Sequence, residues 1–120
     1  MNIPQECNNP VNLMLAKPAG ECTEIRHVNT KTGLGYCYFP TPQAGWRAAF
    51  RQYDSDVKRG LTISQYIFKF APPNENDTNA YLEFVCKEIG CTPSTKLDCI
   101  SKYALAGVQA QMEGYYSRGK

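Results

Sequence analysis

Hydrophobic residues recur at helical spacing through the central and C-terminal parts of the chain. Thr41 and Pro42 mark a helix start, because a capping hydroxyl precedes a proline at the first helical position. Apolar positions then continue to about Val57, and Gly60 ends this segment. The same criteria predict further helices at about 62–70, 79–89 and 101–112, with a short segment near 97–100.

The stretch 66–81, YIFKFAPPNENDTNAY, separates two of these helices. Pro72 and Pro73 prevent the first helix from continuing, since each lacks an amide donor and restrains the residue before it. The side chains of Asn76, Asp77 and Thr78 can cap the next helix. A helix-to-helix corner is one interpretation, and a loop that holds a ligand is the other.

A short β-hairpin is predicted before the first long helix. β-Branched and aromatic residues cluster at 24–28 and 36–39, and the intervening residues 29–35 are rich in Gly, Thr and Asn. Asn8 to Asn12 form a cluster of turn-forming residues near the N-terminus. The expected fold is therefore a single α+β domain over residues 1–120, mostly helical, with one small β-hairpin.

Composition excludes several classes of function. The chain is 42% hydrophobic and 12% aromatic, which is typical of a globular domain. A net charge of +2 is too small to argue for nucleic-acid binding. The apolar runs are too short to span a membrane, and the N-terminus shows no secretory signal.

Six cysteines in a short chain favour disulfides, although the sequence does not resolve their pairing. Their spacings give no zinc motif, and His27 has no second histidine to join it. We therefore expect no metal, no cofactor and a disulfide-stabilised domain. Disulfides imply an oxidising location, periplasmic or extracellular, reached by another route or after removal of a signal peptide.

Carboxylates are the side chains that could carry chemistry. Glu113 ends the last predicted helix and shares a flank with Ala106, Gln109 and Ala110, beside the apolar stripe. A carboxyl in such surroundings should have a raised pKa and could donate a proton near neutral pH. The alternative is an ordinary solvated glutamate at a helix end. A catalytic triad is not expected, because the one histidine lies in a predicted strand.

Four motifs follow one another along the chain: NNPVNL at 8–13, the aromatic strand YCYF at 36–39, PQAGWRA at 42–48 and FAPPNENDTNAY at 70–81. Together they resemble the motifs of a family of phage virion and prophage proteins with lysozyme-like, wall-degrading character. Met112-Glu113-Gly114 also resembles the Glu-Gly pair that ends many members. Together these matches cover roughly residues 7–114. Two departures are Val11, where the family has Gly, and Met112, where it often has His.

The resemblance implies a lysozyme-like domain that cleaves peptidoglycan glycan strands. Because the asparagine turn opens the chain and the glutamate helix closes it, our hypothesis is a circularly permuted fold with adjacent ends. Glu113 would be the general acid and Glu75 or Asp77 the second carboxylate, with Asp77 alternatively a helix cap. Without a second carboxylate, the substrate's acetamido group would assist. The implied glycan-binding residues are Asn8, Asn9, Asn12, Tyr66, Asn76, Asp77 and Tyr81, the tyrosines alternatively being core residues.

Two functions follow from these expectations. The first is a peptidoglycan hydrolase, muramidase- or transglycosylase-like, that is virion-associated or secreted. The second is a non-enzymatic viral structural or wall-binding protein that keeps the lysozyme-like fold. The expected partners are peptidoglycan strands and other virion proteins.

Overall fold

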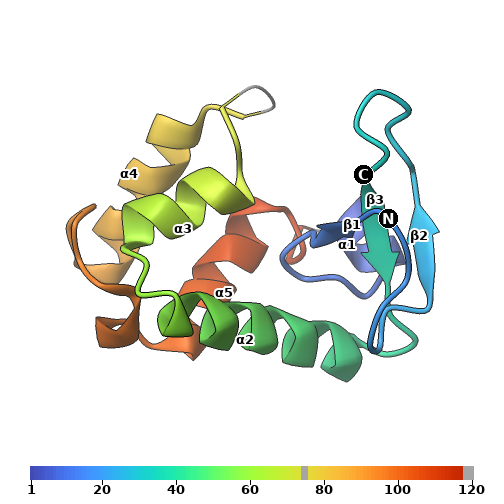
Figure 1. Cartoon of the computed structure of the whole chain (residues 1–120), viewed down its shortest axis with the longest axis horizontal. Coiled ribbons are helices and arrows are strands. Elements are labelled where there is room, and N and C mark those ends of the chain that lie inside the picture. Colours follow the sequence, from blue (N-terminus) through green and yellow to red (C-terminus); the bar gives the residue numbers. More distant parts are fainter. Residues whose placement is uncertain (74–75, 118–120) are drawn as a thin grey trace. The chain divides into compact units, whose positions relative to one another are not determined.

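The computed structural model describes residues 1–73 and 76–117, which form a mostly helical α+β structure (Figure 1). This agrees with the predicted class. None of the described helices is both long and apolar enough to cross a membrane. The elements, in chain order, are α1 (Ile3–Glu6), β1 (Met14–Leu15), β2 (Glu24–Arg26), β3 (Gly35–Tyr38), α2 (Pro42–Lys58), α3 (Ile63–Phe70), α4 (Thr78–Ile89), the 3-10 helix η1 (Leu97–Cys99) and α5 (Lys102–Met112).

The chain divides into two compact units. The first contains residues Met1–Arg51 together with the C-terminal residues from Gln109 onward. The second contains Gln52–Val108. Helices α2 and α5 each contribute residues to both units. The units are described separately below.

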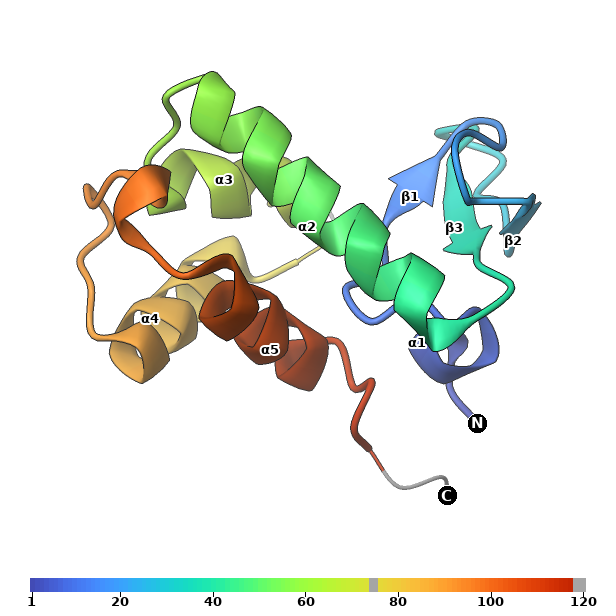
Figure 2. The same cartoon turned by 90° about the horizontal axis from the view of Figure 1, so that it is seen from below.

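The first unit holds a three-stranded antiparallel sheet in the order β1-β3-β2 (Figure 2). β2 pairs with β3 through Glu24 opposite Tyr38 and Ile25 opposite Cys37, which confirms the predicted hairpin. β1 adds Met14 opposite Tyr36 on the other edge of β3. The sequence did not predict β1, because two residues are too few to show an alternating pattern.

A small core of buried residues lies between this sheet and the start of α2. It consists of Cys22, Cys37, Phe39 and Ala44. Gly45, next to that core, allows α2 to approach the asparagine turn closely. A Cβ at Gly45 would lie 1.9 Å from the carbonyl oxygen of Asn8 and 2.9 Å from Cδ of Pro10. The glycine is therefore required at this crossing, since no side chain fits there.

The second unit is built from helices that begin and end close to the positions predicted from the sequence. Thr62 caps α3 through a capping box with Gln65. Asp77 caps α4, which starts at Thr78 rather than Asn79, and Gly90 ends α4 in a left-handed conformation with φ of 80°. The core of this unit includes Ile63, Ile67, Val85, Leu97 and Leu105, all nearly inaccessible to solvent.

Asp56 is a buried charge within the second unit. Only 1% of its side chain is exposed. Its carboxylate accepts hydrogen bonds from Lys69 at 2.6 Å and from Gln52 at 3.0 Å, so the charge is paired and its oxygens are satisfied. This contact joins α3 to the part of α2 that lies in the second unit.

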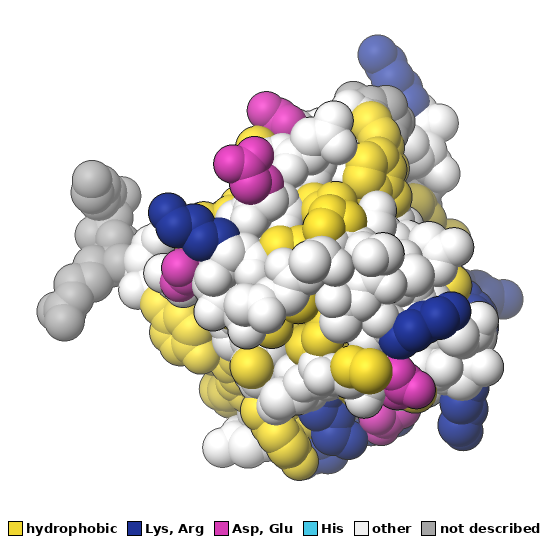
Figure 3. Space-filling view, turned by 90° about the vertical axis from the view of Figure 1, so that its left-hand side faces the viewer, with side chains coloured by type: hydrophobic (Ala, Val, Ile, Leu, Met, Phe, Trp, Pro, Cys, Tyr) yellow, Lys and Arg dark blue, Asp and Glu magenta, His cyan; other side chains and the backbone are white. Residues whose placement is uncertain are grey.

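Charged side chains are interspersed with apolar ones on the face drawn in Figure 3. Among the described residues, ion pairs include Arg47 with Glu21 at 2.6 Å and Lys102 with Asp54 at 3.4 Å. The mixture of signs agrees with the small net charge.

The expected disulfides are not formed, and this prediction requires correction. All six cysteines, which lie within the described residues, are free thiols. Four of them are buried and pack as small apolar side chains: Cys7, Cys22, Cys37 and Cys86. Two causes raise the pKa of Cys86 to about 11: burial, which is the larger, and the hydrogen bond with Cys91. This thiol therefore stays protonated at neutral pH.

Replacing Gly45 by alanine should destabilise the protein by about 1–3 kcal/mol, because the added Cβ overlaps the backbone of Asn8. The matched control is Gly107→Ala in α5, where a Cβ meets nothing within 4 Å. That substitution should stabilise by about 0.5–1 kcal/mol through helix propensity alone. Urea denaturation of both variants tests the difference, and equal effects would contradict the close approach of α2 to the asparagine turn.

Thiol titration should distinguish free cysteines from disulfides. In the native protein we expect only the half-buried Cys91 and the exposed Cys99 to react with Ellman's reagent. After denaturation without a reductant, all six cysteines should react. A smaller number in the denatured protein would show that disulfides form in solution.

Candidate functional site

The two ends of the described chain are joined in the first unit by amide side chains. Asn2 and Gln5 form a capping box at the start of α1, in which each side-chain oxygen accepts from the other residue's backbone N–H at 3.1 Å. Their amide nitrogens donate to the C-terminal segment. Nδ2 of Asn2 donates to the carbonyl of Gly114 at 2.6 Å, and Nε2 of Gln5 donates to that of Tyr115 at 3.0 Å and also to that of Ser117. We call these contacts the terminal clasp.

The C-terminal partner of the clasp is a tight turn that ends α5. Gly114 has a left-handed backbone with φ of 85°. The N–H of Tyr115 donates to the carbonyl of Ala110 at 2.9 Å, and that of Gly114 to Gln111 at 3.2 Å. This is the hydrogen-bond pattern of a Schellman motif, in which glycine avoids the steric cost of positive φ. Glu113 is thereby held directly after Met112, the last residue of α5.

The asparagine turn is fixed by its own side chains. Asn8 and Asn12 have positive φ values of 50° and 56°, which asparagine tolerates better than most residues. Asn9 is fully buried, and its amide bonds to the backbone of Leu13 and Cys37 at 2.9 Å. Val11 does not adopt positive φ and is 1% exposed, so the residue that replaces glycine serves as a core side chain.

Glu113 contacts this turn through Asn12. Nδ2 of Asn12 donates to Oε1 of Glu113 at 3.1 Å, across 101 positions of sequence. Both residues are half-buried. The other amide atom of Asn12, Oδ1, is buried without a hydrogen-bond partner among the described residues. An unsatisfied acceptor of this kind costs about 1–3 kcal/mol, which a donor from a bound molecule would offset.

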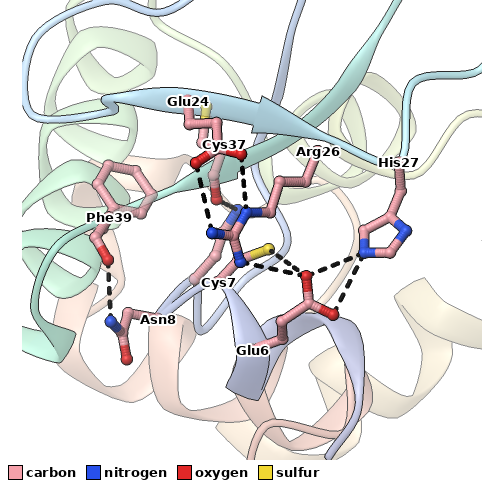
Figure 4. Close-up of polar contacts among 9 residues, drawn as sticks. Glu6, Cys7, Asn8, Glu24, Arg26, His27, Cys37 and Phe39 are labelled. Carbon is pink, nitrogen blue, oxygen red and sulfur yellow. Dashed lines mark hydrogen bonds and ion pairs between the residues drawn. The ribbon is translucent and has the colours of Figure 1, made fainter.

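A second polar network holds α1 to the sheet (Figure 4). Glu6 accepts from His27 at 3.0 Å and from Arg26 at 3.4 Å, and Arg26 also pairs with Glu24 at 3.2 Å. The pKa of Glu6 is lowered chiefly by the hydrogen bond from His27. The positive charge of His27 and the contact with Arg26 lower it further. His27 is thus engaged with a carboxylate at the protein surface. Asn8 joins the same region by donating to the carbonyl of Phe39 at 2.8 Å.

Glu21, another acidic residue of the first unit, is paired with two arginines. Glu21 accepts from Arg47 at 2.9 and 2.6 Å and from Arg51 at 3.2 Å. The hydrogen bond from Arg47 is the main cause that lowers the pKa of Glu21 to about 2. Glu6, Glu21 and Glu24 each form an ion pair with an arginine or histidine side chain.

The other predicted site residues lie in the second unit. Tyr66 and Tyr81 are 3% and 5% exposed within its core, which favours the core alternative for both. Asp77 accepts from the N–H of Ala80 at 3.1 Å as the cap of α4, and Asn76 donates to the carbonyl of Pro72 at 3.3 Å. Glu75 lies outside the described residues.

Four aromatic residues of the first unit were not predicted as site residues, although Trp46 and Phe50 were predicted to lie on the apolar face of the first long helix. Trp46 stacks on Phe50 with ring centroids 6.1 Å apart and meets the edge of Tyr115 at 5.7 Å. Tyr116 lies 6.5 Å from Trp46 and 5.3 Å from Tyr115. Two features of the sequence could have indicated this cluster. One is the i, i+4 spacing of Trp46 and Phe50, which puts both rings on one face of a helix, and the other is the pair of tyrosines after Gly114. Asn2 and Gln5 were also missed, although their spacing is that of a capping box.

Within residues 1–73 and 76–117, no group of three or more His, Cys, Asp or Glu side chains could hold a metal ion. No family model matches this chain. Over 108 residues it is 32% identical to Protein P5 of Pseudoalteromonas phage PM2, and the alignment covers 88% of this chain and 67% of that protein. The chain is thus related to bacteriophage proteins. It belongs to the family of Protein P5.

Removing the Gln5 side chain should weaken the terminal clasp. Gln5→Ala loses half of the capping box and the bonds to Tyr115 and Ser117, and it should destabilise by about 1–2 kcal/mol. Gln43→Ala, at an exposed position in the first turn of α2, is the control and should change stability by less than about 0.5 kcal/mol. If urea denaturation shows the two variants to be equally stable, the terminal clasp does not contribute to the stability of the folded protein.

Proposed function

We propose that this protein cleaves the glycan strand of peptidoglycan and that Glu113 is the general acid. The observation that carries the proposal is the hydrogen bond between Asn12 and Glu113 at 3.1 Å, which brings the helix-ending glutamate to the asparagine turn. A half-buried carboxyl that is held in place by a hydrogen bond from Asn12 is positioned for proton donation.

The chemistry begins with the carboxyl of Glu113. Oε1 accepts from Nδ2 of Asn12, so in this proposal Oε2 is the oxygen that carries the transferable proton. That proton passes to the glycosidic oxygen as the bond to the anomeric carbon breaks. The resulting carboxylate then accepts the proton of the hydroxyl group that attacks the anomeric carbon, which restores the acid.

A route assisted by the substrate fits the first unit better than a two-carboxylate route. Glu6, Glu21 and Glu24 are ion-paired with arginine or histidine, and Asp77 caps a helix. The acetamido oxygen of the sugar would therefore attack its own anomeric carbon as the leaving group departs. Water would then give a hydrolytic product, and a sugar hydroxyl would give a transglycosylase product.

The fold proposed for this activity is lysozyme-like and circularly permuted. The terminal clasp supports this, because permutation requires that the chain ends lie close together. Membership in a bacteriophage protein family supports a location in the virus particle, where the enzyme would open the wall of the host. The phage relationship also supports a second candidate, a non-enzymatic virion or wall-binding protein with the same fold.

Glu113→Gln should abolish clearing of purified peptidoglycan in a zymogram and reduce the rate of cleavage by about 100- to 10,000-fold, the usual loss when an acid catalyst is removed. Asn12→Ala should reduce the rate less, because the acid remains but loses its orienting hydrogen bond. Mass analysis of the soluble fragments would identify the bond that is cleaved and whether an anhydro sugar forms.

Glu88→Gln, which neutralises an exposed glutamate of α4, is the matched control and should retain full activity. Clearing by Glu113→Gln at the normal rate would remove Glu113 from the mechanism. Absence of clearing by the folded unaltered protein would favour the non-enzymatic candidate.

A further inference from the structure

Cys86 and Cys91 lie together where α4 ends (Figure 2). Gly90 turns the chain there with a left-handed backbone, and the N–H groups of Gly90 and Cys91 donate to the carbonyl of Cys86 at 2.8 and 3.0 Å. The bond from Cys91 is the 6→1 bond of a Schellman motif, in which the two joined residues frequently also meet through their side chains. Here that side-chain contact is a hydrogen bond between the two thiols. The turn therefore holds the two sulfur atoms side by side.

The two thiols differ in their access to solvent. Cys86 is 9% exposed and belongs to the core of the second unit, whereas Cys91 is half-buried and packs against that core. A small reagent can therefore reach Cys91 more readily than Cys86. An accessible thiol in contact with a buried one is the arrangement of an attacking and a resolving cysteine in thiol–disulfide exchange.

The other four cysteines lack this arrangement. Cys22 and Cys37 are joined by a hydrogen bond between their thiols, but they are only 3% and 1% exposed. Cys7 is fully buried. Cys99 is exposed, but within the described part of the chain its thiol bonds to the carboxylate of Asp98 at 3.4 Å and not to a second thiol. Cys99 is thus an internal comparison, because it is accessible without a resolving cysteine.

We propose that Cys91 and Cys86 form a redox modification site whose substrates are small disulfides such as oxidised glutathione. The thiolate of Cys91 attacks one sulfur of the small disulfide, which forms a mixed disulfide on Cys91 and releases one small thiolate. The thiolate of Cys86 then attacks the sulfur of Cys91, which closes a disulfide between the two cysteines and releases the second small thiolate. The protein dithiol is oxidised, the small disulfide is reduced, and the two thiol protons pass to the released thiolates.

The resting state of the site is the dithiol, as the structure has it. Ring closure should be slower than the first attack, because the raised pKa of Cys86 keeps most of this thiol protonated at neutral pH. Contact between the two sulfur atoms compensates, since it gives the second thiol a high effective concentration at the mixed disulfide. The site lies in the second unit and does not depend on cleavage of peptidoglycan.

Peptide mapping of the unaltered protein tests the proposal directly. Trypsin cleaves after Lys87 and Lys96, which places Cys86, Cys91 and Cys99 on three different peptides. The folded, reduced protein is treated with oxidised glutathione, its remaining thiols are blocked with iodoacetamide, and the peptides are analysed by mass spectrometry. We expect the peptides of Cys86 and Cys91 to be joined by a disulfide, and the peptide of Cys99 to carry glutathione. Dithiothreitol should reverse both changes.

Ellman's reagent separates the two steps in solution. Cys99→Ser removes the accessible thiol outside the site, so the folded protein should release one equivalent of thionitrobenzoate from attack by Cys91 and a slower second one from closure by Cys86. Adding Cys86→Ala, which replaces a buried small apolar side chain, should leave one equivalent and a stable adduct on Cys91. Circular dichroism should show that both variants are folded.

Several results would overturn the proposal. A glutathione adduct that persists on Cys91 of the unaltered protein would show that Cys86 does not resolve it. Modification of Cys99 alone would show that Cys91 is not accessible. A disulfide between Cys86 and Cys91 that is present before oxidation and resists dithiothreitol in the folded protein would be a structural bond. Mapping needs no variant, so the proposal is tested even if Cys86→Ala does not fold.

Discussion

The terminal clasp is the interaction on which the organisation of the first unit depends. Asn2 and Gln5 use their side-chain oxygens to cap α1 and their nitrogens to bind the carbonyls of the C-terminal turn. An amide side chain can do both, because it has an acceptor and a donor on the same carbon. The same two side chains therefore cap α1 and bind the C-terminal turn. Neither contact requires a charged group.

Residues with a left-handed backbone lie next to Glu113 and in the asparagine turn that it contacts. Gly114 turns the chain after Glu113, while Asn8 and Asn12 turn it around the buried Asn9. Such positions are costly for most residues and persist when local hydrogen bonds support them. The bonds from Asn9 to Leu13 and Cys37 provide that support. The hydrogen-bonded turn and the end of α5 together place Nδ2 of Asn12 at 3.1 Å from Oε1 of Glu113.

Sequence analysis succeeded where structure follows local rules and failed where a contact is formed at long range or a pattern is very short. Thr62, Asp77 and Gly90 were recognisable as helix boundaries, because capping depends on residues only a few positions away. The two-residue strand β1 showed no pattern of its own. The cysteine count suggested disulfides, yet burial places four thiols in the interior as small apolar groups. Trp46 was recognised only as part of an apolar helix face.

The sequence by itself determined the helices, the hairpin and the choice of Glu113 as a distinctive carboxylate, since periodicity, caps and turn residues act over short distances. Tertiary structure decided which groups surround that carboxylate. It brought Asn12 to Glu113 across 101 positions, buried Tyr66 and Tyr81, and left Tyr116 at the surface. These outcomes depend on how side chains from distant segments share space and satisfy hydrogen bonds, which no local pattern encodes.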